Sequence, residues 1–188
     1  MKRAFLIIAL LTIFIGGTAV EAKGQKSKSF FYDGIELHGV KGWTIMPAKE
    51  GNRTTIQAFR LPSNMVINKM PCTVDEGMSQ SRALEIYLEK SIEQIMENSL
   101  SSTGKTPKVK NVSPIMDGYL NNIPAKYVDL TYTKKIVLRI YAIFLHNNLI
   151  TFTCTGVGSS ADKMVDSVFG KILSTFAYNP ESSTHRLF

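Results

Sequence analysis

The segment from Val109 to Val157 constrains the fold of this chain more than any other part of the sequence. It divides into stretches rich in β-branched and aromatic residues, which are typical of strands. These stretches cover residues 109–120, 124–133, 135–147 and 148–157. The links between them are very short and contain Asn121–Asn122, Lys134–Lys135 and Asn147–Asn148. Asparagine tolerates the positive φ of tight hairpins, and links of this length join antiparallel neighbours, so the segment predicts an antiparallel meander.

Strands are also predicted before the meander. Residues 53–62 alternate in polarity, and residues 64–74 form another extended segment. Pro71 cannot donate a ladder hydrogen bond, so we expect this second strand to be an edge strand or to be bulged. Residues 136–145 differ, because they are apolar on both faces apart from Arg139. That pattern predicts a central strand covered on both sides.

Two helices complete the pattern. Residues 79–100 carry apolar side chains at the spacing of one helical face, namely Leu84, Leu88, Ile92 and Ile95. A second row in this helix consists of Glu85, Glu89, Glu93 and Glu97. We interpret this row as a solvated stripe, because aligned like charges normally stay in water. The other helix is predicted over residues 159–178, where Gly170 costs ~1 kcal/mol relative to alanine and indicates close packing.

The first residues have the three-part pattern of a secretory signal peptide. Lys2 and Arg3 precede an apolar run from Ala4 to Gly17, and Val20 and Ala22 occupy the −3 and −1 positions of a cleavage site. The run is shorter than the ~20 residues of a bilayer span, although an uncleaved anchor is the alternative. We therefore expect a signal peptide over residues 1–22, cleaved after Ala22, and an exported protein that is periplasmic or secreted. Residues 23–28 are then a flexible lead-in, 29–178 a single domain and 179–188 a mobile tail.

The chain is basic, with a formal net charge of +7. A basic balance raises nonspecific affinity for anions. The lysines are scattered. Single-stranded nucleic acid requires aromatic residues interleaved with basic ones on one sheet face, and Tyr127, Tyr132, Arg139 and Tyr141 come nearest to that pattern. We interpret these tyrosines as packed beneath a helix, so no nucleic-acid partner is expected. An anionic surface remains an alternative if the strand cations converge on one face. Those cations are Lys69, Lys126, Lys134, Lys135 and Arg139.

Cys72 and Cys154 are the two cysteines of the chain. In an oxidising compartment such a pair can form a disulfide. Each shares strand parity with apolar neighbours, which places both on core-facing positions. A Cys72–Cys154 disulfide and two buried free thiols are both open at this stage.

Side chains for catalysis are sparse. The histidines, His38, His146 and His185, have no zinc-ligand spacing, and the chain contains no G-x-S-x-G elbow. We predict no catalytic, cofactor-binding or metal-binding residue, and no cofactor. Asp129 is a carboxylate on a strand that should be well covered. If it is buried it needs a partner, and Arg139 on the next strand is the expected one.

Several stretches resemble the DcrB/PsbP-like superfamily over about residues 29 to 178. They are "IELHGVKGWTI", "LEIYLEKSIEQI", the meander "GYLNNIPAKYVDLTYTKKIVLRIYAIFLHNNLITFTCTG" and the helix end "ILSTF". The chain departs from the family at "LHGVKGW", where a proline is expected before the Gly-Trp. The resemblance implies an α+β fold, with a single antiparallel sheet of about six strands and helices packed on both faces. Members of the superfamily are mostly noncatalytic, and they include photosystem II subunits, a GTPase binder, effector chaperones and envelope proteins.

These observations lead to one functional hypothesis and one rival. The hypothesis is an exported, noncatalytic protein that binds or stabilises a protein partner in the bacterial envelope, in a chaperone-like or immunity-like role. The rival is a small-ligand carrier or enzyme with a pocket between sheet and helix. Fold analogy does not choose between them.

Overall fold

The computed structural model describes residues 29–60, 62–101, 108–133 and 136–180. The expected signal peptide (1–22), its cleavage site after Ala22 and the lead-in (23–28) lie outside the described residues, as does most of the expected tail. Among the described helices, none has the length and apolar character needed to cross a membrane.

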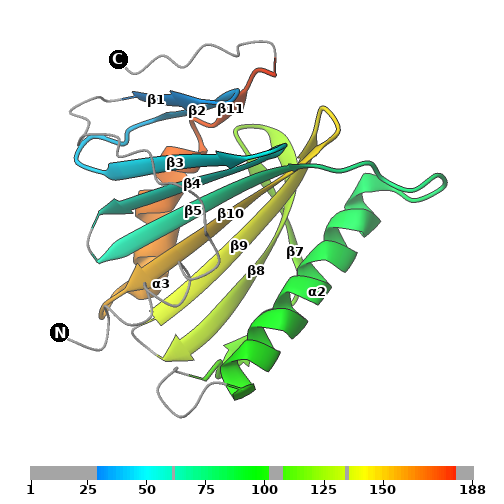
Figure 1. The fold of residues 1–188 in the computed structure, drawn as a ribbon. Helices are drawn as coiled ribbons and strands as arrows, with labels where there is room; N and C mark the ends of the chain where they lie inside the picture. Colours follow the sequence, from blue (N-terminus) through cyan, green and yellow to red (C-terminus); the bar gives the residue numbers. More distant parts are fainter. Residues whose placement is uncertain (1–28, 61, 102–107, 134–135, 181–188) are drawn as a thin grey trace.

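The centre of the fold is one large antiparallel sheet of eight strands (Figure 1). Its strands in spatial order are β3 (Thr44–Glu50), β4 (Arg53–Arg60), β5 (Ser63–Pro71), β10 (Asn148–Val157), β9 (Ile136–Leu145), β8 (Ile123–Thr133) and β6 (Asn111–Val112). An eighth strand, β7 (Met116–Leu120), pairs with the other end of β8. The predicted antiparallel meander is confirmed, because β8, β9 and β10 are consecutive neighbours.

A separate three-stranded sheet consists of β1 (Ser29–Tyr32), β2 (Ile35–His38) and β11 (Ala177–Tyr178). The expected α+β fold, a single antiparallel sheet of about six strands sandwiched by helices on both faces, was therefore wrong. The described residues are mostly strand and form two sheets, one of them with eight strands. Asp33 and Gly34 both have positive φ and fold β1 tightly onto β2. This hairpin then pairs with β11 at the chain's end instead of extending the large sheet. The extra sheet packs through Phe30, Ile35 and Leu37 into the core of the large sheet.

Two details of the strands also differ from expectation. The strand that ends at Pro71 is not an edge strand, because β5 lies between β4 and β10. Its proline is harmless because it is the last residue of the strand. The β9–β10 turn uses the positive φ of His146 and Asn147 rather than Asn147 and Asn148.

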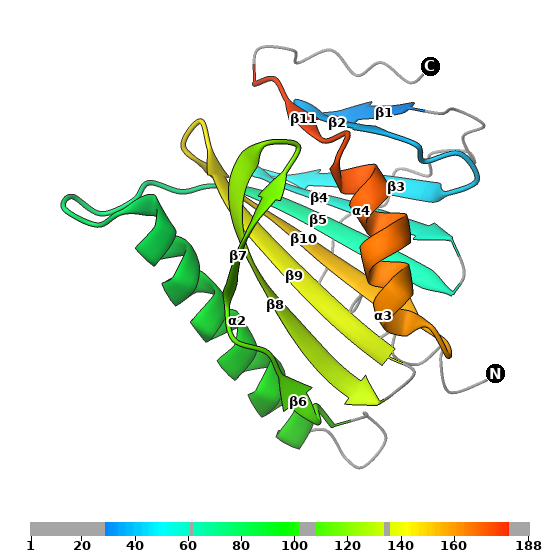
Figure 2. The same ribbon diagram turned by 180° about the vertical axis from the view of Figure 1, so that it is seen from behind.

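The helices lie on opposite sides of the large sheet (Figures 1 and 2). The helix α2 (Gln80–Ser101) contacts β8 and β9. The C-terminal helix begins as α3 (Ala161–Met164), widens into the π-helix η1 (Val165–Phe169) and ends as α4 (Gly170–Leu173). Gly170 has no close neighbour, contrary to expectation. The close approach is at Gly156, where a Cβ would lie 2.5 Å from the Ala161 carbonyl oxygen.

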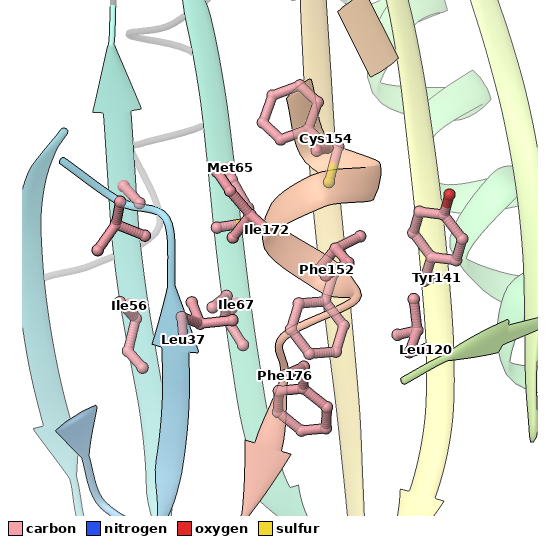
Figure 3. Close-up of a cluster of buried hydrophobic side chains, with 14 of the residues drawn as sticks. Leu37, Ile56, Met65, Ile67, Leu120, Tyr141, Phe152, Cys154, Ile172 and Phe176 are labelled. Atoms are coloured by element: carbon pink, nitrogen blue, oxygen red, sulfur yellow. The ribbon is translucent and has the colours of Figure 1, made fainter. Parts of the chain in front are cut away.

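Each face of the sheet carries its own hydrophobic core. The larger core lies under the C-terminal helix and the small sheet, and Phe152, Phe169 and Phe176 are fully buried in it. Figure 3 shows Phe152 and Phe176 in this cluster. The smaller core lies under α2, where Leu84 and Leu88 pack on β8, β9 and Leu149 of β10. Adjacent residues of β9 alternate between the two cores, so this strand is central as predicted.

Candidate functional site

The most highly connected polar group on the sheet is Arg139 of β9. It lies directly opposite Asp129 of β8. Nε and Nη2 of Arg139 donate to the two carboxylate oxygens of Asp129 at 2.6 and 2.8 Å. Both side chains are mostly buried, and the hydrogen bonds that Arg139 donates to Asp129 raise the pKa of Arg139 above its already high value. Arg139 therefore stays charged, held in a two-point contact with its neighbour.

The π-helix adds a second carboxylate to this centre. Asp166 accepts a hydrogen bond from Arg139 Nη1 at 2.7 Å, and the hydroxyl of Tyr141 accepts another at 3.2 Å. The guanidinium carbon also lies 5.0 Å from the ring centroid of Tyr127. Asp166 is largely exposed, whereas Arg139 is not. This Arg139 cluster thus joins the C-terminal helix to the sheet. Each guanidinium nitrogen of Arg139 already donates a hydrogen bond within the cluster, so the cluster is a structural ion-pair network.

A second polar centre joins the small sheet to the large one. Asp33, in the β1–β2 turn, forms ion pairs with Lys49 of β3 and Lys69 of β5 and accepts a hydrogen bond from Thr54 of β4. Lys69 is buried, and it also donates to the backbone oxygen of Asp33 at 2.8 Å and lies over the ring of Tyr178. Burial alone would raise the pKa of Asp33, but the hydrogen bonds from Lys49, Lys69 and Thr54 prevail and lower it to about 2. We call this centre the Asp33 clasp.

The Asp33 clasp was not predicted from the sequence. Its only local signals were Asp33–Gly34, a dipeptide typical of tight hairpins, and Lys69 on the same strand face as buried Ile67. Neither signal says that the turn reaches across three strands of another sheet. That contact exists only because the hairpin folds back over the large sheet.

Lys126 forms a third centre, on the α2 side. This buried side chain binds Glu85 of α2 at 2.7 Å and Asp117 of β7 at 2.9 Å. The hydrogen bonds that Lys126 donates to Glu85 and, with a smaller effect, to Asp117 raise the pKa of Lys126. Glu85 is therefore not simply part of a solvated stripe, because it ties the first half of α2 to the sheet.

The strand cations do not converge on one face. Lys126 faces α2, whereas Lys69 and Arg139 face the C-terminal helix, and each of the three is bound to carboxylates. Lys134 and Lys135 lie outside the described residues. The geometry thus gives no basis for an anionic surface bound by this set.

The two cysteines are free thiols and lie on opposite faces of the sheet. Cys154 is fully buried in the larger core, and burial raises the pKa of its thiol. Cys72 follows β5 and packs partly buried against the smaller core. Both positions face a core, but the sheet has two cores, so the Cys72–Cys154 disulfide considered above is not formed.

His38 lies in a chain of contacts on the β1–β2 hairpin. Its Nδ1 is 2.7 Å from the Ser29 hydroxyl and its Nε2 is 3.0 Å from a carboxylate oxygen of Glu36. The residue types are those of a hydrolase triad, but His38 and Glu36 are 48% and 42% exposed. Polar contacts this exposed are typical of the surface of a hairpin. Within the described residues, no group of three or more His, Cys, Asp and Glu side chains could hold a metal ion.

The α2 side of the large sheet also has an uncharged half. Three cross-strand rows on β3, β4, β5 and β10 face the same side as α2, beside the part of the sheet that forms the smaller core. We call these side chains the neutral strip: Thr44, Met46, Ala48, Thr55, Gln57, Phe59, Asn64, Val66, Asn68, Thr151, Thr153 and Thr155. None is charged, and Figure 1 shows no described helix over β3, β4 and β5 on this side. None is exposed either: Thr55, Asn64, Thr151 and Thr155 are buried, and the other eight are partly buried.

Comparison with known proteins identifies the fold. No protein-family model and no curated protein sequence matches the chain. Among solved structures, the chain is similar to the solution structure of cyanobacterial PsbP (CyanoP) from Synechocystis sp. PCC 6803. The TM-score is 0.56 at 13% sequence identity, over 84% of this chain and 97% of that one. The chain therefore has a PsbP-like fold.

Proposed function

We propose that this chain is an exported, noncatalytic protein that binds or stabilises a protein partner in the bacterial envelope. The neutral strip is the observation that carries the proposal. Protein interfaces are depleted of charge at their centre and enriched in methionine and aromatic residues, surrounded by a polar rim. The strip has Met46 and Phe59 within it and the exposed charges of Glu50 and Arg53 at one end.

The polar centres support the same function. Arg139, Lys69 and Lys126 are each bound to carboxylates of neighbouring elements, and each joins two parts of the fold. Ion pairs of this kind hold a scaffold in one arrangement. A rigid scaffold presents a binding surface at a lower entropic cost than a mobile one. The PsbP-like fold and the signal-like N-terminus add to the proposal without identifying the partner.

The test is purification of the epitope-tagged full-length chain from its own envelope after mild chemical cross-linking, followed by mass spectrometry. We expect one protein to be enriched in amounts comparable to the chain itself. A parallel extract is searched for bound metabolites. Recovery of a metabolite together with only background proteins would contradict the proposal and favour a ligand carrier.

Export is tested separately by sequencing the N-terminus of the purified protein. Cleavage after Ala22 predicts a chain that begins at Lys23. A chain that still begins at Met1 would refute the cleaved signal, while leaving the binding proposal to the first experiment.

A further inference from the structure

We infer that the small sheet is a conformational device, in which the hairpin of β1 and β2 opens and closes together with the segment Thr175–Asn179. We call this segment the C-terminal strap. The inference goes beyond the proposed function, because none of the contacts that carry it involves the neutral strip. It rests on the separation of the two sheets, on the hydrogen bonds of the strap and on the core that both ends of the domain share.

The small sheet is built from both ends of the domain. Its strands β1 and β2 come first among the described strands, and β11 comes last. Among the described residues, no strand of this sheet pairs with a strand of the large sheet. An isolated two-stranded hairpin is marginally stable at best, and β11 has two residues. The hairpin and the strap therefore depend on each other.

On one side, the strap contacts turns of the large sheet. Asn121 in the β7–β8 turn donates through Nδ2 to the backbone oxygen of Phe176 at 2.9 Å. Asn148, beside the β9–β10 turn, donates to the hydroxyl of Tyr178 at 3.3 Å. Figure 2 shows both turns at the same end of the molecule as β11. These hydrogen bonds hold the strap, and with it the small sheet, against the large one.

On the other side, the strap closes on the hairpin. The backbone nitrogen of Asn179 donates to the backbone oxygen of Gly34 at 2.8 Å. The backbone nitrogen of His38 donates to Oγ1 of Thr175 at 2.9 Å. Gly34 has a φ of +84°, and a Cβ at this position would lie 2.7 Å from the backbone oxygen of Asn179. The turn and the strap thus fit too closely for any side chain at Gly34.

The hairpin and the strap also share one core. Phe30, Ile35 and Leu37 of the hairpin and Phe176 of the strap are buried in the same cluster. The ring of Phe176 makes an edge contact with Phe152 of the large sheet. Displacement of the strap would therefore uncover the hairpin's own apolar side chains. Elements that bury each other in this way open as one cooperative unit, at a lower free energy than the whole fold.

Amide hydrogen exchange of the full chain, read by mass spectrometry, tests the inference. Asn121→Gly removes the hydrogen bond to Phe176, and glycine keeps the φ of 46° that the turn requires. The matched control is Asn122→Gly, the same change at the next residue, where φ is 66°. The exposed side chain of Asn122 does not bond to the strap within the described residues.

We expect Asn121→Gly to speed exchange roughly fivefold, the factor for one hydrogen bond, in peptides of the hairpin and of the strap alike. Peptides of β8, β9 and β10 should be unchanged, and the control should match the wild type. A second variant, Thr175→Val, removes the acceptor of the His38 backbone nitrogen. It acts from the hairpin side and should speed exchange in the same two groups of peptides.

Four results would overturn the inference. Faster exchange in the strap alone would show that the hairpin stays closed without it. Equal acceleration in β8, β9 and β10 would show that the small sheet opens only with the whole fold. Equal acceleration in Asn122→Gly would assign the effect to the turn instead of the strap. Unchanged exchange in both Asn121→Gly and Thr175→Val would show that these hydrogen bonds do not hold the unit closed.

Discussion

The two faces of the large sheet are built from the same strands but are closed in different ways. One face is covered by the C-terminal helix and the small sheet, which together bury a large aromatic core around Phe152. The other face has α2 over β8 and β9 and the neutral strip over the remaining strands. We therefore expect stability to come mainly from the first face, and the proposed function places partner recognition on the second. The predictions below test this division.

The largest expected effect follows removal of an aromatic ring from the covered face. Phe152 is fully buried and makes an edge contact with Phe176, with ring centroids 5.0 Å apart. Phe152→Ala should lower the free energy of unfolding by about 3–5 kcal/mol, because it removes buried apolar surface and leaves a cavity. Urea denaturation followed by circular dichroism measures the change. A loss below about 1 kcal/mol would show that this core is not the main source of stability.

The next effect concerns the Arg139 cluster on the same face. Asp129→Ala leaves the mostly buried Arg139 with only the exposed Asp166 as an anionic partner. The free energy of unfolding should fall by about 3 kcal/mol, near the lower end of the range for a broken buried pair. The control is the double variant Asp129→Leu with Arg139→Met, which removes both charges. It should be more stable than Asp129→Ala alone, and equal stability of the two variants would contradict a buried-charge penalty.

A smaller effect is expected from the Asp33 clasp, and it depends on pH. Because the pKa of Asp33 falls from 3.8 to about 2 on folding, the folded state favours the ionised carboxylate. The stabilisation is therefore complete above about pH 4 and is lost as pH falls towards 2. It should amount to roughly 1 kcal/mol after allowance for partial solvent screening.

The measurement compares urea unfolding of the wild type and Asp33→Asn between pH 2 and pH 6. The wild type should lose stability over the acidic part of this range more steeply than the variant. Parallel pH profiles for the two proteins would show that Asp33 is not the titrating group.

The clasp also shows where sequence reasoning stops. Asp129 and Arg139 lie on strands joined by a short turn, so alternation along each strand is enough to bring them to one face. Asp33 and Lys69 lie on different sheets, and nothing local in the sequence specifies how those sheets meet. The two-residue strand β11 could not be predicted from the sequence either, because only its pairing with β2 distinguishes it from an irregular chain segment. Short-range turn chemistry was predictable, whereas packing between sheets was not.

The cysteines show the same limit of sequence-based prediction. Strand parity places Cys154 and Cys72 each on a face with apolar neighbours. It does not say whether those faces are the same, because that depends on the register between β5 and β10. In that register Cys154 lies opposite Met65, on the face away from Cys72. In a sheet with a core on each side, two core-facing residues can therefore lie on opposite faces, as Cys72 and Cys154 do.

The smallest effect on stability is expected at the neutral strip, and it is the sharpest test of the comparison. Val66 is half-buried on β5, and it lies between Gln57 and Thr153. Val66→Ala should change the free energy of unfolding by less than about 1 kcal/mol, several-fold less than Phe152→Ala, because Val66 is only partly buried and belongs to neither hydrophobic core. Urea denaturation measures both variants under identical conditions.

If the strip is a binding surface, Val66→Ala should still weaken partner recovery. Phe152→Ala should not weaken it at a temperature where that variant remains folded. A Val66→Ala variant as unstable as Phe152→Ala would mean that this half of the face is closed by the chain itself, and the division between a stabilising face and a recognising face would fail.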